Sequence, residues 1–99
     1  MIIPKLLIAG NGELQVVTSA TLCPTLPCKL LKFKASNSNA GNVYIGKSGL
    51  TKVDGTTDTT TGYRLEPGDD SGWLPVANLN KFYRICDNAG DALTYIALA

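Results

Sequence analysis

Ten glycines and five prolines divide this 99-residue chain into short segments, and this division limits its fold more than any other feature. Apolar spacing at three- and four-residue intervals, the pattern of an amphipathic helix, is hard to find between them. Short runs rich in β-branched and aromatic residues are frequent instead, and turn-forming residues lie between them. These runs predict strands at 14–19, 30–35, 42–46, 50–53, 62–65, 73–76, 82–86 and 92–98.

The even spacing of strands and turns is typical of a sandwich or barrel. We therefore predict an all-β chain, with one small antiparallel β-sandwich and a jelly roll as the preferred topology, although other sandwiches fit the same pattern. Ninety-nine residues are enough for one domain. One short helical turn is expected at 76–80, capped by Asn78, and the Thr-rich stretch 56–61 is expected to be a surface loop.

The predicted strand 92–98 is apolar on both faces. Leu93, Tyr95 and Ala97 alternate with a second set of mostly apolar residues, namely Ala92, Thr94, Ile96 and Leu98. Such a strand suits the centre of a sheet or an interface between subunits. Because little polar surface remains for water, we predict a homo-oligomer, with a trimer favoured, and Leu93 and Tyr95 are interface candidates.

The first twelve residues are rich in large aliphatic side chains, and the flexible Gly10-Asn11-Gly12 at their end separates them from the first clear predicted strand. They suit either an edge strand of the same domain or an arm that pairs with a neighbouring subunit, and Pro4 fits both alternatives. We favour an arm at 1–12 and a sandwich domain at 13–99, because the strands from Leu14 onward already close a small sandwich. The arm's interface candidates are Ile2, Ile3, Leu6, Leu7 and Ile8. Its apolar runs are too short to cross a membrane and do not resemble an export signal, so we expect neither a membrane-spanning segment nor export.

The residue types argue against catalysis. Histidine is absent, which removes the common nucleophile and base arrangements, so we expect no enzyme. Cys23, Cys28 and Cys86 match no zinc pattern, and we expect free thiols in a reducing cytosol, with a Cys23–Cys28 disulfide as the alternative. We expect no metal and no cofactor. The paired acids lie beside turn glycines and are expected to bond the local backbone rather than to act in catalysis or hold calcium; they are Asp69 with Asp70 and Asp87 with Asp91.

Net charge is +1, which gives no general attraction for nucleic acid, and we expect no nucleic-acid partner. The five large aromatics Tyr44, Tyr63, Trp73, Tyr83 and Tyr95 lie in predicted strands. We expect them to pack in the core or across strands, while a sugar-binding groove built from exposed members remains the alternative.

Residues 28–98 contain a strand ending in KASNSNAGNVYIGKSGLT, then a Thr-rich loop, then GYRLEPGDDSGWLPVANLNKFYRICDNAGDALTYIAL. This order resembles a set of small proteins encoded among the virion structural genes of tailed phages, which includes capsid decoration proteins and minor head proteins. The resemblance implies a bacteriophage structural protein that binds and stabilises the capsid lattice. Its partners would be the major capsid protein or other virion proteins, and its location the virion, assembled in the host bacterial cytoplasm.

The family pattern contributes no catalytic or ligand residue. The alternative function is a receptor- or carbohydrate-binding module of a head fibre or tail component.

Overall fold

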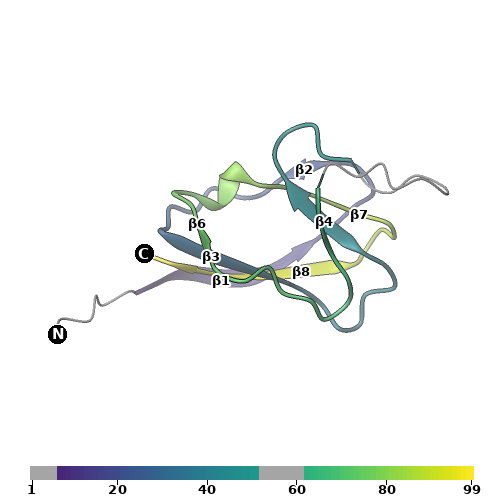
Figure 1. Cartoon of the computed structure of the whole chain (residues 1–99), viewed down its shortest axis with the longest axis horizontal. Coiled ribbons are helices and arrows are strands. Elements are labelled where there is room, and N and C mark those ends of the chain that lie inside the picture. Colours follow the sequence, from purple (N-terminus) through teal and green to yellow (C-terminus); the bar gives the residue numbers. More distant parts are fainter. Residues whose placement is uncertain (1–6, 52–61) are drawn as a thin grey trace.

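The computed structural model describes residues 7–51 and 62–99, and within them the chain is almost entirely β (Figure 1). Its elements are the strands β1 (Ile8–Gln15), β2 (Thr21–Leu22), β3 (Leu30–Ala35), β4 (Val43–Gly46), β5 (Tyr63–Leu65), β6 (Leu74–Pro75), β7 (Tyr83–Cys86) and β8 (Ala92–Leu98), with the 3-10 turn η1 (Leu79–Lys81) before β7. The predicted turn near Asn78 is confirmed slightly further along the chain: the Asn78 side chain accepts a hydrogen bond from the Asn80 amide and caps η1.

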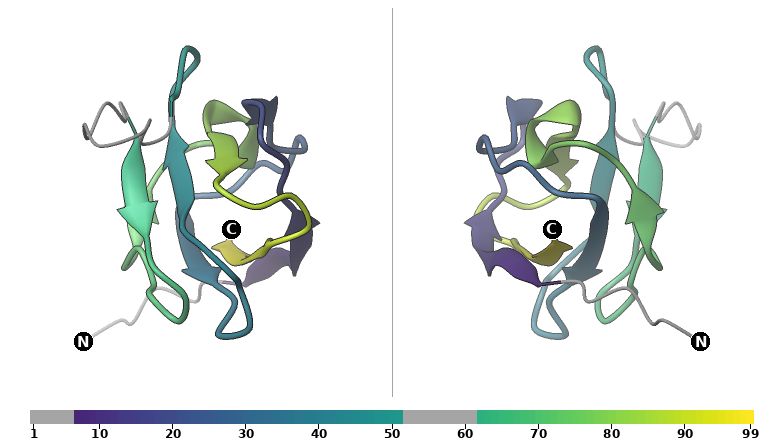
Figure 2. Two further views of the ribbon diagram at one scale, coloured as in Figure 1. Left: turned by 90° about the vertical axis from the view of Figure 1, so that its right-hand side faces the viewer. Right: turned by 90° about the vertical axis from the view of Figure 1, so that its left-hand side faces the viewer.

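The strands form two antiparallel four-stranded sheets, in the orders β1-β8-β3-β6 and β2-β7-β4-β5. Figure 2 shows the two sheets as layers that face each other. β1 pairs with β8, β2 with β7, β3 with β6 and β4 with β5. The chain thus folds back on itself between β4 and β5, and the resulting double strand wraps into two sheets. This is the jelly-roll topology, and the predicted fold class is confirmed.

Alternation along the strands places one set of side chains between the sheets. Leu31, Phe33 and Ala35 from β3 meet Leu93 and Ala97 from β8 there, and none of these five is accessible to solvent. The other sheet contributes a second set, which includes Val43, Ile45, Leu65 and Cys86. The rings of Phe33 and Phe82 meet edge to face at a centroid distance of 5.2 Å.

A smaller apolar cluster lies on the outer face of the β2-β7-β4-β5 sheet. Leu50 packs there on Tyr44 and Ile85, with Tyr83 at the margin. The predicted strand at 50–53 is wrong for its described residues, since Leu50 and Thr51 are not in a strand. Leu50 instead covers the sheet from a loop. Residues 52–53 and the predicted Thr-rich loop at 56–61 lie outside the described residues.

β1 begins at Ile8, so the preference for an arm is wrong for residues 8–12. These residues form part of an edge strand paired with β8, which is the other alternative for this segment. The two glycines make room for side chains that cover the strand. A Cβ at Gly10 would lie 2.9 Å from Leu26 Cδ2, and one at Gly12 would lie 3.3 Å from Tyr95 Oη. Met1 to Leu6 lie outside the described residues.

Asparagine and aspartate side chains fasten the loop after β3 to the start of β8. The amides of Ala40 and Gly41 each donate to a carboxylate oxygen of Asp91 at 3.0 Å. Asn39 exchanges two hydrogen bonds with the backbone of Ala92, at 2.9 and 2.8 Å. Asp87 accepts from the Tyr44 hydroxyl. The expected backbone-bonding role of Asp91 is confirmed, although it also spans two distant loops.

Replacing Asp91 by alanine is expected to lower the free energy of unfolding by about 2–4 kcal/mol, because two loop amides lose the charged acceptor that the buried carboxylate provides. Urea unfolding measures the loss. Asp69→Ala is the matched control, since Asp69 accepts from the Glu66 amide in an exposed turn, and its cost is expected to be about 1 kcal/mol or less. Equal losses in the two variants would show that Asp91 does not anchor these loops.

Candidate interaction surface

The outer face of the β1-β8-β3-β6 sheet presents side chains in rows that cross the strands. Leu31 and Phe33 in β3 and Leu93 in β8 point into the core. The residues that alternate with them along each strand therefore point to the outer face of the sheet. The pairing registers align these outward residues across the sheet. The polar row is Glu13, Thr94, Lys34 and Asp70; the middle row begins Asn11, Ile96 and Lys32; and the apolar row is Ile8, Leu98, Leu30 and Pro75.

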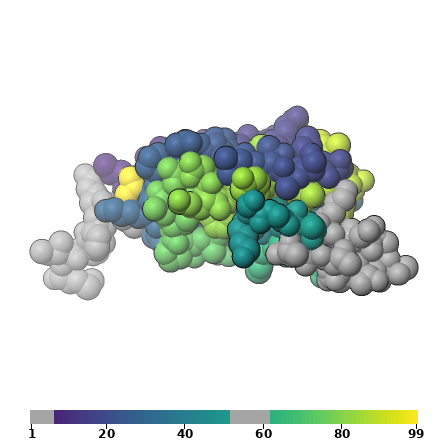
Figure 3. All heavy atoms as spheres, turned by 90° about the horizontal axis from the view of Figure 1, so that it is seen from above, coloured from purple at the N-terminus to yellow at the C-terminus, as the bar shows by residue number. Residues whose placement is uncertain are grey.

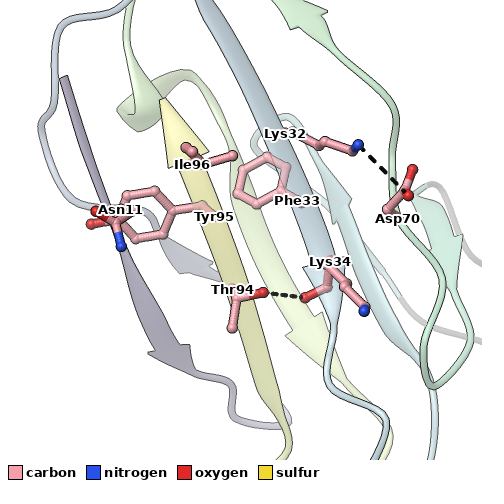
Figure 4. Close-up of a pocket in the computed structure, with 8 residues that line it drawn as sticks. All are labelled: Asn11, Lys32, Phe33, Lys34, Asp70, Thr94, Tyr95 and Ile96. Carbon is pink, nitrogen blue, oxygen red and sulfur yellow. Dashed lines mark hydrogen bonds and ion pairs between the residues drawn. The ribbon is translucent and has the colours of Figure 1, made fainter. Parts of the chain in front are cut away.

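Most members of the polar and middle rows line a shallow depression of about 430 Å³ (Figure 4). Lys32 Nζ lies 3.9 Å from Asp70 Oδ2 and 5.4 Å from the centre of the Trp73 ring. The Thr94 hydroxyl donates to the Lys34 carbonyl at 3.2 Å. The depression therefore offers two ammonium groups and several hydrogen-bonding groups beside an indole ring.

The apolar row lies at the end of the sheet where β1 begins and β8 ends. The Ala99 amide donates to the Leu7 carbonyl at 2.6 Å, and Figure 3 shows the start of β1 beside the C-terminus. Leu7 and Ile8 are 60% and 63% exposed, and Trp73 is 46% exposed. Leu30 and Leu98 are half-buried and Pro75 is exposed. This end of the face is thus an apolar patch that no other described element covers.

The predicted interface residues divide between these surfaces and the core. Leu7 and Ile8 are exposed at the apolar end, whereas Ile2, Ile3 and Leu6 lie outside the described range. The prediction for Leu93 is wrong, because its side chain is fully buried between the sheets and cannot reach a partner. Tyr95 also faces inward and is half-buried over Gly12.

The sequence shows that β8 is apolar on both faces, but it does not show which face is enclosed. The central position of β8 in its sheet is confirmed. The outward residues Ile96 and Leu98 are therefore the interface candidates that sequence reasoning missed. Their signal was the same alternation, assigned to the opposite face.

The aromatic side chains also differ in exposure. Tyr44 is fully buried, as predicted for a core residue, whereas Tyr63 is 61% exposed. Tyr63 borders an opening between the two sheets of about 390 Å³, where Ile45, Leu74 and Phe82 form apolar walls. This opening exposes a part of the core at the β5 and β6 edges.

No cluster of metal-ligating side chains occurs within residues 7–51 and 62–99. All three thiols are free, as predicted, and all are buried. Cys28 Sγ donates to the Val76 carbonyl at 3.3 Å. Burial raises the pKa of the Cys23 thiol, and the nearby Arg84 guanidinium offsets part of that rise. A thiol of this kind is a poor nucleophile at neutral pH.

Comparison with known proteins finds no relative. No protein-family model matches the chain, and neither a curated protein nor a solved structure matches it. In the part of the chain that the structure describes, no helix is long and apolar enough to cross a membrane.

Leu93→Ala is expected to lower the free energy of unfolding by about 2–5 kcal/mol, because it leaves a cavity between the sheets. Ile96→Ala, on the opposite face of the same strand, is expected to cost about 1 kcal/mol or less. Thermal or urea unfolding of the two variants measures the difference. A larger loss for Ile96→Ala would mean that the two faces of β8 are assigned the wrong way round.

The ordinary pKa of the Cys23 thiol is 9.0. Below that pH the thiol is protonated in both the folded and the unfolded chain, so its full contribution to the free energy of unfolding is expected there. Above that pH the unfolded chain ionises first, so the free energy of unfolding should fall as pH rises toward the higher folded pKa. Urea unfolding between pH 7 and 10 tests this against Cys23→Ala, which should show a smaller alkaline loss. Identical pH profiles would contradict the expectation.

Proposed function

We propose that this chain is a structural subunit of a tailed-phage particle, a capsid decoration or minor head protein that binds the capsid lattice. The observation that carries the proposal is the apolar row across the outer face of the β1-β8-β3-β6 sheet. Apolar residues from all four strands lie together there, and no other described element covers them. Contiguous exposed apolar surface of this kind is typical of a contact site.

The size of the face favours a repetitive partner. Strands lie about 4.8 Å apart and residues rise about 3.4 Å along a strand, so the three rows cover on the order of 300–400 Å². A stable one-to-one complex commonly buries about 800 Å² on each partner. One such contact is weak, whereas many copies on a symmetric lattice hold firmly through avidity.

The charges beside the apolar row indicate what the partner's surface should be like. Lys32 and Lys34 lie in the neighbouring rows, with Asp70 close to Lys32. Glu13 and Asp70 share the polar row with Lys34, so an apolar capsid surface with both acidic and basic residues at its rim would complement this arrangement.

The jelly roll agrees with the proposal without selecting it, because the fold serves viral capsid proteins and lectins alike. The resemblance of residues 28–98 to virion structural proteins favours the first of these. We accordingly propose the major capsid protein or another virion protein as partner, the virion as location, and a homo-oligomeric state.

A second candidate function is glycan or receptor binding, as in a head fibre or tail component. The depression of Figure 4 favours it, since amide, hydroxyl and charged groups surround a site next to Trp73. Lys32 lies over the indole ring, however, and competes with a sugar for that surface. We therefore rank it below lattice binding.

The proposal predicts that the protein co-purifies with intact particles in many copies each. Leu98→Asp, which places a charge in the apolar row, is expected to lower that copy number at least tenfold while the protein stays folded. Gln15→Asp, on the same face but at its polar end, serves as the control and should leave the copy number unchanged. Quantitative mass spectrometry of purified particles provides the measurement.

Absence of the protein from purified particles would contradict the proposal. Binding to a glycan array that Trp73→Ala abolishes, with no particle association, would favour the second candidate instead.

A further inference from the structure

Four strands lie at the edges of the two sheets, and their lengths are very unequal. β2 and β6 have two residues each and β5 has three, whereas β1 has eight. Short edge strands, prolines and lysines are common means of preventing unwanted strand pairing. β6 contains Pro75, but β1 contains neither proline nor lysine. Among the described edges, β1 is therefore the long one that remains available for pairing.

The hydrogen bonds show which backbone groups of β1 point away from β8. Val16 donates to the Asp91 carbonyl and accepts from the Gly90 amide, so its backbone faces β8. Because this direction alternates along an antiparallel strand, the backbone amides and carbonyls of Leu14 and Gly12 point toward β8 as well. Those of Asn11, Glu13 and Gln15 point toward the free edge of the sheet. Arg84 Nε donates to the Gln15 carbonyl at 3.3 Å. Across the described ranges, no hydrogen bond uses the outward amides and carbonyls of Asn11 and Glu13.

We propose that β1 pairs with β1 of a second copy of this chain, antiparallel about a twofold axis perpendicular to the sheet. Their two four-stranded sheets then become one continuous eight-stranded sheet. Backbone hydrogen bonds supply the affinity in such strand addition. The inference concerns the isolated protein and does not depend on a role in the particle.

Registers centred on Asn11, Gly12, Glu13 or Leu14 keep the edge-facing backbone groups of both strands opposed and the inner faces continuous. Centring the axis on Leu14 would require the Gln15 carbonyl, which already accepts from Arg84. Centring the axis on Glu13 places two like charges directly opposite each other, which is unfavourable. Centring it on Asn11 places Glu13 opposite Ala9, within the irregular pairing between Ile8 and Gly10. Centring it on Gly12 avoids all three problems.

The Gly12-centred register is also favourable in itself. Asn11 of each copy lies opposite Glu13 of the other, so an amide can donate to a carboxylate twice, beside about four backbone hydrogen bonds. The two Gly12 residues then form the close pair at the axis, where Cα atoms approach to about 4.5 Å. Glycine is commonly found where another backbone approaches closely. Leu14 of each copy faces Gly10 of the other.

The first test uses the backbone donor itself. Glu13→Pro removes the outward amide and costs no bond to β8, while Glu13→Ala removes the same side chain and keeps the amide. Light scattering of the full chain should give about twice the chain mass of 10.5 kDa for the wild type and for Glu13→Ala. Glu13→Pro should give the monomer mass, with its thermal transition still cooperative. A wild type that is monomeric or trimeric, or a dimeric Glu13→Pro variant, would overturn the inference.

The second test reads the register. The positions of Asn11 and Glu13 in opposite copies would lie about 5.5 Å apart between Cα atoms, within disulfide range. An oxidised mixture of Asn11→Cys and Glu13→Cys proteins should therefore give covalent heterodimers. Each variant alone should stay uncrosslinked, because like positions lie about 8 Å apart, and the native thiols are buried. Crosslinks within one variant, or none in the mixture, would reject this register even if Glu13→Pro fails to fold.

The two proposals can fail separately. A protein that dimerises through β1 but never joins particles refutes the proposed function and keeps the inference. A protein that binds particles, but whose copy number on the particle and molecular mass in solution are unchanged by Glu13→Pro, refutes the inference and keeps the proposed function.

Discussion

The pairing of β8 with two strands that do not touch each other holds the first sheet together. β1 pairs along one side of β8 and β3 along the other. The inward side chains Leu93 and Ala97 are fully buried, and the outward ones join the rows on the opposite face. Asp91 and Asn39 fix the loops where this strand begins. The core, the outer face and the open edge thus all depend on the position and register of one strand.

The acidic residues and amides of this chain mostly bond the backbone. Asp91 joins two loops, Asp87 binds the Tyr44 hydroxyl, and Asn78 accepts from the amides of Leu26 and Asn80. In so small a domain, loops are a large share of the chain, and their amides need acceptors wherever water is excluded. Backbone hydrogen bonding therefore accounts for the acidic pairs in the turns, and no catalytic or metal-binding role is needed to explain them.

Local patterns predicted most of the strands, and distant contacts account for what they missed. The bounds of β3 and β8 agree with the prediction, because clean alternation marks both. β1 was misplaced because Gly10 and Gly12 suggest a flexible link when seen alone; Leu26 and Tyr95, distant in sequence, fill the space above them. β2 has too few residues to form a pattern. The apolar row draws its members from four separate segments, so it became visible only once the pairing registers were known.

The two proposed contact surfaces point in different directions, and this allows one copy to use both. The apolar row faces along the normal of the β1-β8-β3-β6 sheet, whereas the free edge of β1 faces sideways within it. Edge pairing adds directional hydrogen bonds, each with a net value of about 1 kcal/mol, and so defines geometry more than strength. The apolar row gives attraction with little directional preference. A twofold pair would present two such rows on one continuous sheet face, doubling the contact area offered to a lattice. Dimerisation at the edge would thereby strengthen attachment through the face without any new contact to the partner.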